Sequence, residues 1–312
     1  MALHRLGGRT WVSHKSAKRM LERPDEKIGR LFQGVVEIPS LPSVVEKLLA
    51  IPVNEETERQ FVDVIAVDPG LVAKVLRLVN NAFYSLRAPI GSLPQAAHIL
   101  GRRTLKSLAL SAAIGDVFRG GFQDLDPTRL WRHSVAVGTA ARCLGEACFT
   151  DAADDLYVAG FLHDLGIFLL AEHLPDDYRL VMRLMEHGGK SLSEVEVEVF
   201  GMSHAELSYT LAQRWKLPPV LGECIRLHET PYSGVAADGD ESQQWIDVVR
   251  YAHRWAIHNG LGFVGTASEP LEEPDWFAAT EIDPKAILGD ETLKWVDSHV
   301  AIFESEGNGV GA

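Results

Sequence analysis

The residues of this chain that could do chemistry centre on one charged pair, His163 and Asp164, within the apolar stretch from Val158 to Leu170. The run of apolar residues predicts one buried helix, and burying a carboxylate beside an imidazole costs several kcal/mol unless each finds a partner. A divalent metal ion would be such a partner, because adjacent nitrogen and oxygen donors can share one ion or bridge two. The alternative is a hydrogen-bonded pair in the core, with no metal.

Four further histidines, each in or at the end of another predicted helix, favour the metal. His133 lies 30 residues before His163, and three more follow at intervals of 41, 24 and 25 residues, as His204, His228 and His253. Because the helices of a bundle can direct side chains inward, these histidines and Asp164 are predicted to converge on one point. A hydrogen-bonded polar core formed by the same six side chains is the alternative.

Helical periodicity extends through most of the chain, and no strand pattern of convincing length interrupts it. The fold class is therefore predicted to be all-α. A first helix is predicted from the spacing of Val44, Val45, Leu48 and Leu49, and another begins at Pro69. The other predicted helices cover approximately residues 55–67, 104–118, 127–149, 151–170, 178–187, 191–200, 203–215, 218–228, 243–259, 276–280 and 291–303.

Several helix starts are marked by capping residues. Asp68-Pro69 and Asp126-Pro127 each place an acceptor before a proline in the first helical position. Ser191 and Glu194 form a predicted capping box, and Ser203 is predicted to begin the helix whose first turn carries His204. Gly138, on the helix with His133, is expected to allow close approach of a neighbouring helix.

The composition is that of an ordinary globular protein, with 46% hydrophobic and 23% charged residues among 312. The three cysteines, Cys143, Cys148 and Cys224, are odd in number and lack CxxC spacing, which favours reduced thiols. No window is long and apolar enough for a membrane span, and the N-terminus lacks a signal-like apolar core. A cytoplasmic protein without a membrane span is therefore expected.

The formal charge of −13 is unevenly distributed. From Asp238 onward there are 15 acidic residues against four basic ones, whereas residues 1–30 hold eight basic residues against three acidic ones. So acidic a region repels phosphate backbones, which argues against general nucleic-acid binding. The predicted organisation is a basic N-terminal tail (1–29), one helical domain (30–262, with halves 30–122 and 123–262) and an acidic C-terminal appendage (263–312).

Three blocks of sequence resemble one family. The order of the His and His-Asp positions resembles the HD superfamily of metal-dependent phosphohydrolases. The segments IPSLPSVVEKLL, DPGLVAKVLRLVNNAFYS and IGSLPQAAHILGRRTLKSLAL, and the later FGMSHAE, WKLP and HET, look like its HDOD branch. The resemblance implies a multi-helix HD-type bundle with an N-terminal helical subdomain.

The resemblance also implies a ligand set. His133, His163 and Asp164 would hold one metal ion together with a late aspartate, and Asp164 would bridge to a second ion held by His204 and His228. In this chain the late aspartate position is His253, an imidazole that favours Fe, Mn, Ni or Zn over magnesium. Asp247 lies six residues earlier, about 240° around the helix, and is not expected to replace it. No organic cofactor is expected.

Two functions from different classes follow from the resemblance. One is a regulatory signal-transduction module that binds protein partners and retains a possible metal site. The other is a metal-dependent phosphohydrolase acting on a nucleotide or a cyclic dinucleotide. Phosphodiesterase relatives carry a lysine where this chain has Ile167, and HHE where it has HET at 228–230. These departures favour the regulatory module, and no catalytic residue is assigned.

Overall fold

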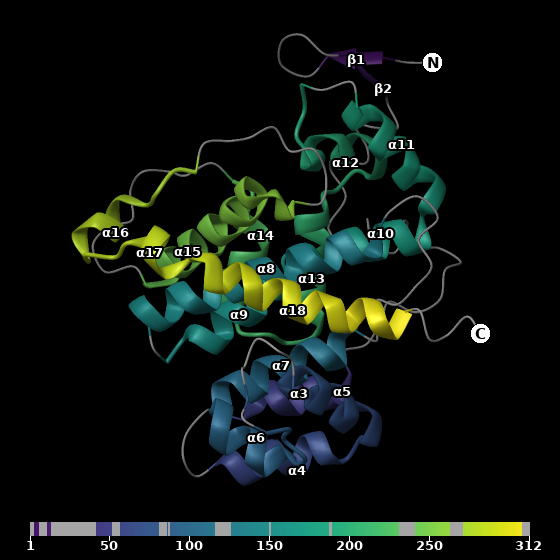
Figure 1. The fold of residues 1–312 in the computed structure, drawn as a ribbon. Coiled ribbons are helices and arrows are strands. Elements are labelled where there is room, and N and C mark those ends of the chain that lie inside the picture. Colours follow the sequence, from purple (N-terminus) through teal and green to yellow (C-terminus); the bar gives the residue numbers. More distant parts are fainter. Residues whose placement is uncertain are drawn as a thin grey trace.

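In the computed structural model the described residues are 3–5, 11–13, 42–51, 57–80, 86, 88–115, 126–149, 151–186, 189–230, 241–262 and 271–307. They are mostly helical, which confirms the all-α prediction (Figure 1). One short antiparallel hairpin, β1 (Leu3–Arg5) with β2 (Trp11–Ser13), was not predicted; the rest of the basic tail lies outside the described residues. Within the described part of the chain, no helix combines the length and apolarity needed to cross a bilayer.

Five short helices form the N-terminal half, grouped at one end of the molecule (Figure 1). They are α3 (Ser43–Ala50), α4 (Glu58–Ala66), α5 (Pro69–Val79), α6 (Leu93–Leu100) and α7 (Arg102–Gly115). Asp68 caps α5 as predicted, accepting hydrogen bonds from the amides of Gly70 and Leu71. Helix α7 packs against α3, α5 and α6 on one side and against α9 on the other, so it joins the two halves.

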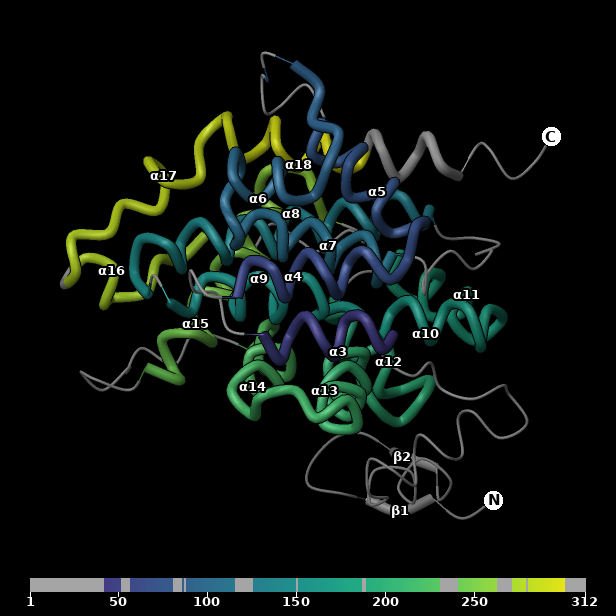
Figure 2. Tube along the Cα trace, turned by 90° about the horizontal axis from the view of Figure 1, so that it is seen from below, coloured from purple at the N-terminus to yellow at the C-terminus, as the bar shows by residue number. Residues whose placement is uncertain are grey.

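The second half is built around α8 (Pro127–Cys148), the longest described helix. Seen from below, the N-terminal helices lie in front of this second half (Figure 2). Helix α8 packs against α9 and α15. The other elements are α9 (Ala153–Leu162), α10 (Leu165–His173), α11 (Pro175–Glu186), α12 (Leu192–Phe200), α13 (His204–Arg214), α14 (Pro219–Leu227), α15 (Glu241–Ala256) and the π-helical turn η3 (Ile257–Leu261).

The predicted caps of this half form. Asp126 accepts the amide of Thr128 at 2.9 Å at the start of α8. Ser191 and Glu194 make both hydrogen bonds of a capping box at the start of α12. Ser203 caps α13 through the amide of Glu206, which fixes the start of the helix where His204 stands. The first residue of α13 is therefore positioned by local hydrogen bonds as well as by packing.

The helix predicted across Val158 to Leu170 is divided in two, and the continuous helix was wrong. Helix α9 ends at Leu162, α10 begins at Leu165, and Asp164 has φ −98° and ψ 14°, outside the helical range. The Ile167 amide donates to the Asp164 carbonyl at 2.9 Å and starts α10. Consecutive side chains on one helix point about 100° apart, and the break frees His163 and Asp164 from that constraint.

Helices α8 and α9 approach closely at two glycines. A Cβ on Gly160 would lie 2.9 Å from the Val137 carbonyl oxygen and 3.0 Å from the Gly138 Cα. A Cβ on Gly138 would lie 3.1 Å from the Tyr157 carbonyl oxygen. The close approach expected at Gly138 is present, and it joins the helix that carries His133 to the one that ends beside His163.

Three helices form the C-terminal part: α16 (Asp275–Ala279), α17 (Pro284–Ile287) and α18 (Asp290–Gly307). The short α17 was not predicted. Helix α18 lies along α8, with Trp295 and Val296 buried and Arg132 paired with Asp297 (Figure 1). The C-terminal part therefore covers the helix that carries His133. The domain boundaries drawn from the sequence stay a prediction.

Candidate metal centre

The structure brings all six predicted ligands into one buried cluster. His133 comes from α8, His163 and Asp164 from the break between α9 and α10, and His204 from the first turn of α13. His228 ends α14, and His253 lies in the last turn of α15. Each of the six is at most 8% exposed. The donor atoms form two groups that share Asp164: His133, His163, Asp164 and His253; and Asp164, His204 and His228.

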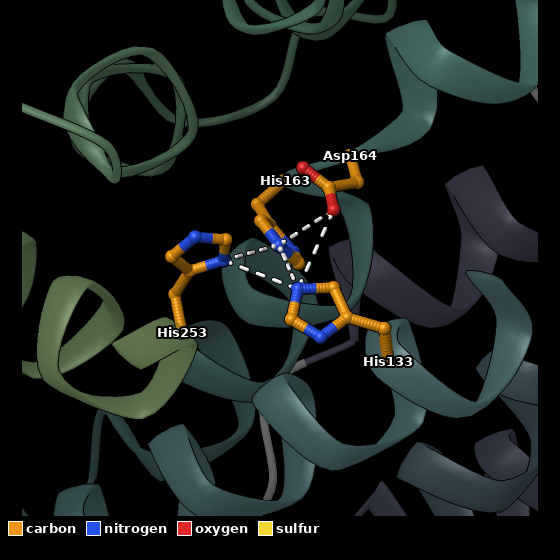
Figure 3. Close-up of side chains that lie close together, drawn as sticks. All are labelled: His133, His163, Asp164 and His253. Atoms are coloured by element: carbon orange, nitrogen blue, oxygen red, sulfur yellow. Dashed lines mark hydrogen bonds and ion pairs between the residues drawn. The ribbon is translucent and has the colours of Figure 1, made fainter. Parts of the chain in front are cut away.

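The first group surrounds a point between α8, α15 and the His-Asp break (Figure 3). His163 Nε2 lies 3.2 Å from His133 Nε2 and 3.1 Å from His253 Nδ1, and the last two atoms are 3.1 Å apart. Asp164 Oδ2 lies 3.2 Å from His163 Nε2 and 3.5 Å from His133 Nε2. Three ring nitrogens and one carboxylate oxygen therefore face one another at close range.

The second group uses the other oxygen of the same carboxylate. Asp164 Oδ1 lies 3.3 Å from His204 Nε2 and 3.4 Å from His228 Nε2, and these two nitrogens are 3.5 Å apart. Glu229 Oε1 lies 3.7 Å from His204 Nε2. Asp164 is thus placed to bridge two positions, one oxygen to each.

The outward nitrogens of three rings fix which nitrogen carries the proton. His133 Nδ1 lies 2.9 Å from the Leu261 carbonyl oxygen, His163 Nδ1 2.6 Å from that of Gly160, and His228 Nδ1 2.7 Å from that of Ile225. A carbonyl oxygen can only accept, so each Nδ1 carries a hydrogen and, in the neutral ring, each Nε2 offers a lone pair to the cluster. Metal-binding histidines are oriented in this way.

Lone pairs that face one another need a positive centre between them. His133 Nε2 and His163 Nε2 are both acceptors, and a proton on His253 Nδ1 would satisfy one of them. The other would still face acceptors, so at least one buried ring nitrogen of the first group is left without a donor. An unsatisfied buried acceptor costs about 1–3 kcal/mol. The cluster therefore fits a metal ion better than a hydrogen-bonded polar core.

Burial and charge set the protonation of the first group. Burial lowers the pKa of His133 to about 4, and it also lowers the pKa of His163 and holds that of His253 well below its usual range. Burial alone would raise the pKa of Asp164, but the charge of His163 when protonated and hydrogen bonds from the neighbouring rings in that form outweigh burial and hold this pKa well below its ordinary value. The first group is therefore neutral imidazoles around a carboxylate, which is the ligand form that binds divalent ions.

The second group lies in a more negative field. Burial alone would lower the pKa of His204, but the carboxylates of Glu196 and Glu229 raise it well above its usual range. A field that holds a proton on this ring also favours a metal cation beside it, and such a cation would displace the Nε2 proton.

The spacing of the donors matches a first-row divalent ion. Bonds of about 2.0–2.1 Å in a tetrahedral arrangement place ligand atoms about 3.3–3.4 Å apart. An octahedral ion with similar bonds places adjacent ligands about 3.0 Å apart. The donor separations given above for the two groups run from 3.1 to 3.5 Å, so the cluster has the dimensions of a coordination shell.

Sequence reasoning missed two acidic residues of the site. Glu196 is fully buried, and its Oε2 lies 2.6 Å from His204 Nδ1 and accepts the His204 amide at 2.7 Å. Glu229 forms a third possible ligand group with His228 and His253 and accepts a hydrogen bond from Ser193. Two features of the sequence could have indicated them: Glu196 lies between valines in α12, and Glu229 directly follows His228. Asp247 lies outside all three groups, as expected.

Comparison with known proteins identifies the family. The model of the HDOD domain matches residues 38–231, more than half of the chain. The chain belongs to the HDOD domain family. The matched region contains four of the five histidines of the cluster and Asp164, while His253 lies beyond it. The match confirms the resemblance to the HDOD family that the sequence indicated.

Proteins of known structure share the fold. An HDOD domain protein of unknown function from Geobacter sulfurreducens is 25% identical, with a TM-score of 0.75 over 92% of this chain and 98% of that one. A protein from Shewanella amazonensis described as a candidate phosphohydrolase is 24% identical, with a TM-score of 0.63 over 89% of this chain and 97% of that one. An uncharacterised protein of Treponema pallidum is 29% identical over 62% of this chain. The matched region spans only 37% of that relative's length.

Proposed function

We propose that this HDOD chain is a regulatory module that acts by binding protein partners in a cytoplasmic signalling pathway, and that its His-Asp cluster holds a divalent ion of Fe, Mn, Ni or Zn. The burial of the cluster carries the proposal. The ligands are at most 8% exposed, and five of the six are 3% exposed or less. A phosphoester must reach the ion to be hydrolysed, whereas an ion with a structural role needs no opening.

The residues around the cluster support the same reading. Ile167, at the position where phosphodiesterase relatives carry a lysine, is 1% exposed in α10 and offers no charge to a phosphate. A cation there would be worth a few kcal/mol to the transition state. His253 contributes a neutral ring in place of an aspartate, so the first group carries only the charge of Asp164. Neither Ile167 nor His253, among the described residues, supplies a charged group that would stabilise a phosphoryl transition state.

One observation favours the alternative, a metal-dependent phosphohydrolase. Asp164 offers one oxygen to each donor group, and the second group has fewer buried protein donors. Glu229, beside it, has a side chain that is 21% exposed and is the least buried of the possible ligands. A pair of ions in such a site can supply hydroxide near neutral pH and stabilise an in-line displacement.

Metal analysis of the purified chain tests the ion. We expect the wild type to retain Fe, Mn, Ni or Zn at about one or two equivalents and the His163→Ala/Asp164→Ala variant to lose it. Because both side chains are buried, circular dichroism must show that the variant folds; His258→Ala, at an exposed position past α15, is the matched control. Stoichiometric metal in the folded double variant would remove the cluster from the proposal.

Activity and partner binding separate the two functions. We expect no hydrolysis of nucleotides, cyclic dinucleotides or simple phosphoesters by the protein loaded with Mn or Fe. Turnover that disappears in the double variant would establish the phosphohydrolase instead. For the regulatory module, a protein recovered with the tagged chain should bind it again when both are purified. Failure of every recovered protein to do so would contradict the proposal.

A further inference from the structure

A second buried ion pair lies next to the cluster, on α15. Asp247 and Arg250 are 1% and 4% exposed, and Arg250 Nη1 donates to Asp247 Oδ1 at 2.8 Å. Arg250 stands one helical turn before His253. Neither residue is in a ligand group, and the functions considered above make no use of them. A buried pair of this kind is costly to form, so its contacts are informative.

Arg250 reaches across to the turn that carries His228 of the second group and Glu229 of the third possible group. Its Nη2 donates to Thr230 Oγ1 at 2.8 Å and to the Leu227 carbonyl oxygen at 3.4 Å. Thr230 closes the same turn, donating from its amide and its hydroxyl to the Leu227 carbonyl at 3.1 and 2.7 Å. Leu227 and Thr230 flank His228 and Glu229, so one guanidinium holds both ends of this turn.

Asp247 connects the pair to the C-terminal part of the chain. Trp276 of α16 donates its indole Nε1–H to Asp247 Oδ2 at 3.2 Å, and Gln243 donates to Oδ1 at 3.0 Å. The Trp276 ring also packs against Phe149 at the end of α8, with centroids 5.8 Å apart. Trp276, which lies 45 positions beyond the matched family segment, is therefore linked through Asp247 and Arg250 to the turn that carries His228.

We infer that Arg250 and Asp247 are positioning residues for the second ligand group, and that Trp276 of the C-terminal part holds them in place. The inference rests on the proposed metal centre. The guanidinium fixes the turn that orients the His228 ring, and the carboxylate fixes the guanidinium. Groups that orient metal ligands from behind contribute about 10–100-fold to metal affinity. Rigid bidentate donors such as Arg suit this role, because their geometry is fixed.

Metal titration of the full-length chain tests the inference. The metal-free protein is titrated with Zn²⁺ or Mn²⁺ against a chromophoric chelator. We expect Arg250→Met to weaken one bound equivalent about tenfold or more and to leave the other unchanged. Trp276→Phe should weaken the same equivalent less, because it acts through Asp247. The matched control is Arg142→Met on α8. It removes a guanidinium that contacts Thr104 of α7 and Glu146 of α8 and lies away from the 227–230 turn.

A second readout does not depend on metal. In the metal-free chain with ¹⁵N-labelled histidine, the Nδ1–H of His228 donates to Ile225 and that of His163 to Gly160. We expect Arg250→Met and Trp276→Phe to speed the exchange of the His228 proton with water and to leave that of His163 unchanged. Arg142→Met should change neither. This measurement also covers the case in which the wild type binds no ion, which would refute the proposed metal centre alone.

The outcomes are distinguishable. Arg250→Met that weakens neither equivalent, or both equally as a general loss of stability would, overturns the inference. So does unchanged exchange at His228. If Arg250→Met does not fold, Trp276→Phe, which keeps the ring packing and removes one N–H, carries both measurements with the same criteria.

Discussion

Gly166, two residues after Asp164, lies against the backbone of α13 at the residue that provides a ligand. A Cβ built on Gly166 would lie 2.3 Å from the His204 carbonyl oxygen and 2.9 Å from the His204 Cα. The Gly166 amide also donates to Ser208 Oγ at 2.7 Å, which fixes α10 against α13. Because the contacted atoms are backbone, they cannot rotate away, and Gly166→Ala must move the two helices apart.

The expected cost follows from that overlap. Inserting atoms into a packed core costs about 1–3 kcal/mol, and a clash with backbone belongs at or above the upper end. A loss of about 3 kcal/mol would lower the Tm by about 6–12 °C for a domain of this size. The displacement also moves His204 relative to Asp164, so binding of the second metal equivalent should weaken together with stability.

Urea unfolding and metal titration of Gly166→Ala measure both effects. Gly289→Ala is the matched control, because a Cβ there meets nothing within 4 Å and the backbone does not need glycine. It should be neutral or slightly stabilising. Equal stability of the two variants would refute the packing argument, and a destabilised Gly166→Ala with unchanged metal binding would refute the link between the α10–α13 contact and His204.

Three further predictions follow from individual contacts. Removing metal with a chelator should lower the Tm, since an ion present at about 1,000 times its Kd stabilises the folded state by about 4 kcal/mol; a calorimetric scan with and without chelator measures this. Glu196→Gln should weaken metal binding about 10–100-fold in a competition titration, because the group that orients His204 loses its charge. Burial raises the pKa of Asp154 to about 6, so the folded state binds a proton at this carboxyl more tightly than the unfolded state does. The free energy of unfolding of the wild type should therefore fall as the pH rises from about 4 through 6. Asp154→Asn should lack this decrease in urea unfolding between pH 4 and 8.

Local rules predicted the helix starts of this chain well. Asp68, Asp126, Ser191 and Ser203 each make the capping hydrogen bond that their sequence context indicates. These bonds join residues two or three positions apart, so the information needed is present in a few consecutive letters. The close approach at Gly138 was predicted for a similar reason, because a glycine can be identified in the sequence without knowing which helix packs against it.

Features that depend on distant residues were not predictable in the same way. The apolar stretch around His163 and Asp164 satisfies every local criterion for one helix, yet the chain breaks there, where side chains from α8, α13, α14 and α15 meet His163 and Asp164. Glu196 follows the same logic. It lies in sequence between two exposed glutamates, Glu194 and Glu198, and only the position of His204, eight residues later, shows why it is buried. Tertiary contacts therefore override local propensity at the site itself.

The cost of burying the cluster explains how the second half of the fold is held together. Six polar side chains occupy positions where apolar ones would pack, and several of their inward atoms are acceptors without donors. An ion would convert these unfavourable contacts into bonds between α8, the His-Asp break, α13, α14 and α15. Metal affinity would then be part of the folding free energy. Because Arg250 and Trp276 tie α14 and α16 to the same centre, the C-terminal part, although outside the matched family segment, would belong to the physical unit that such an ion would stabilise.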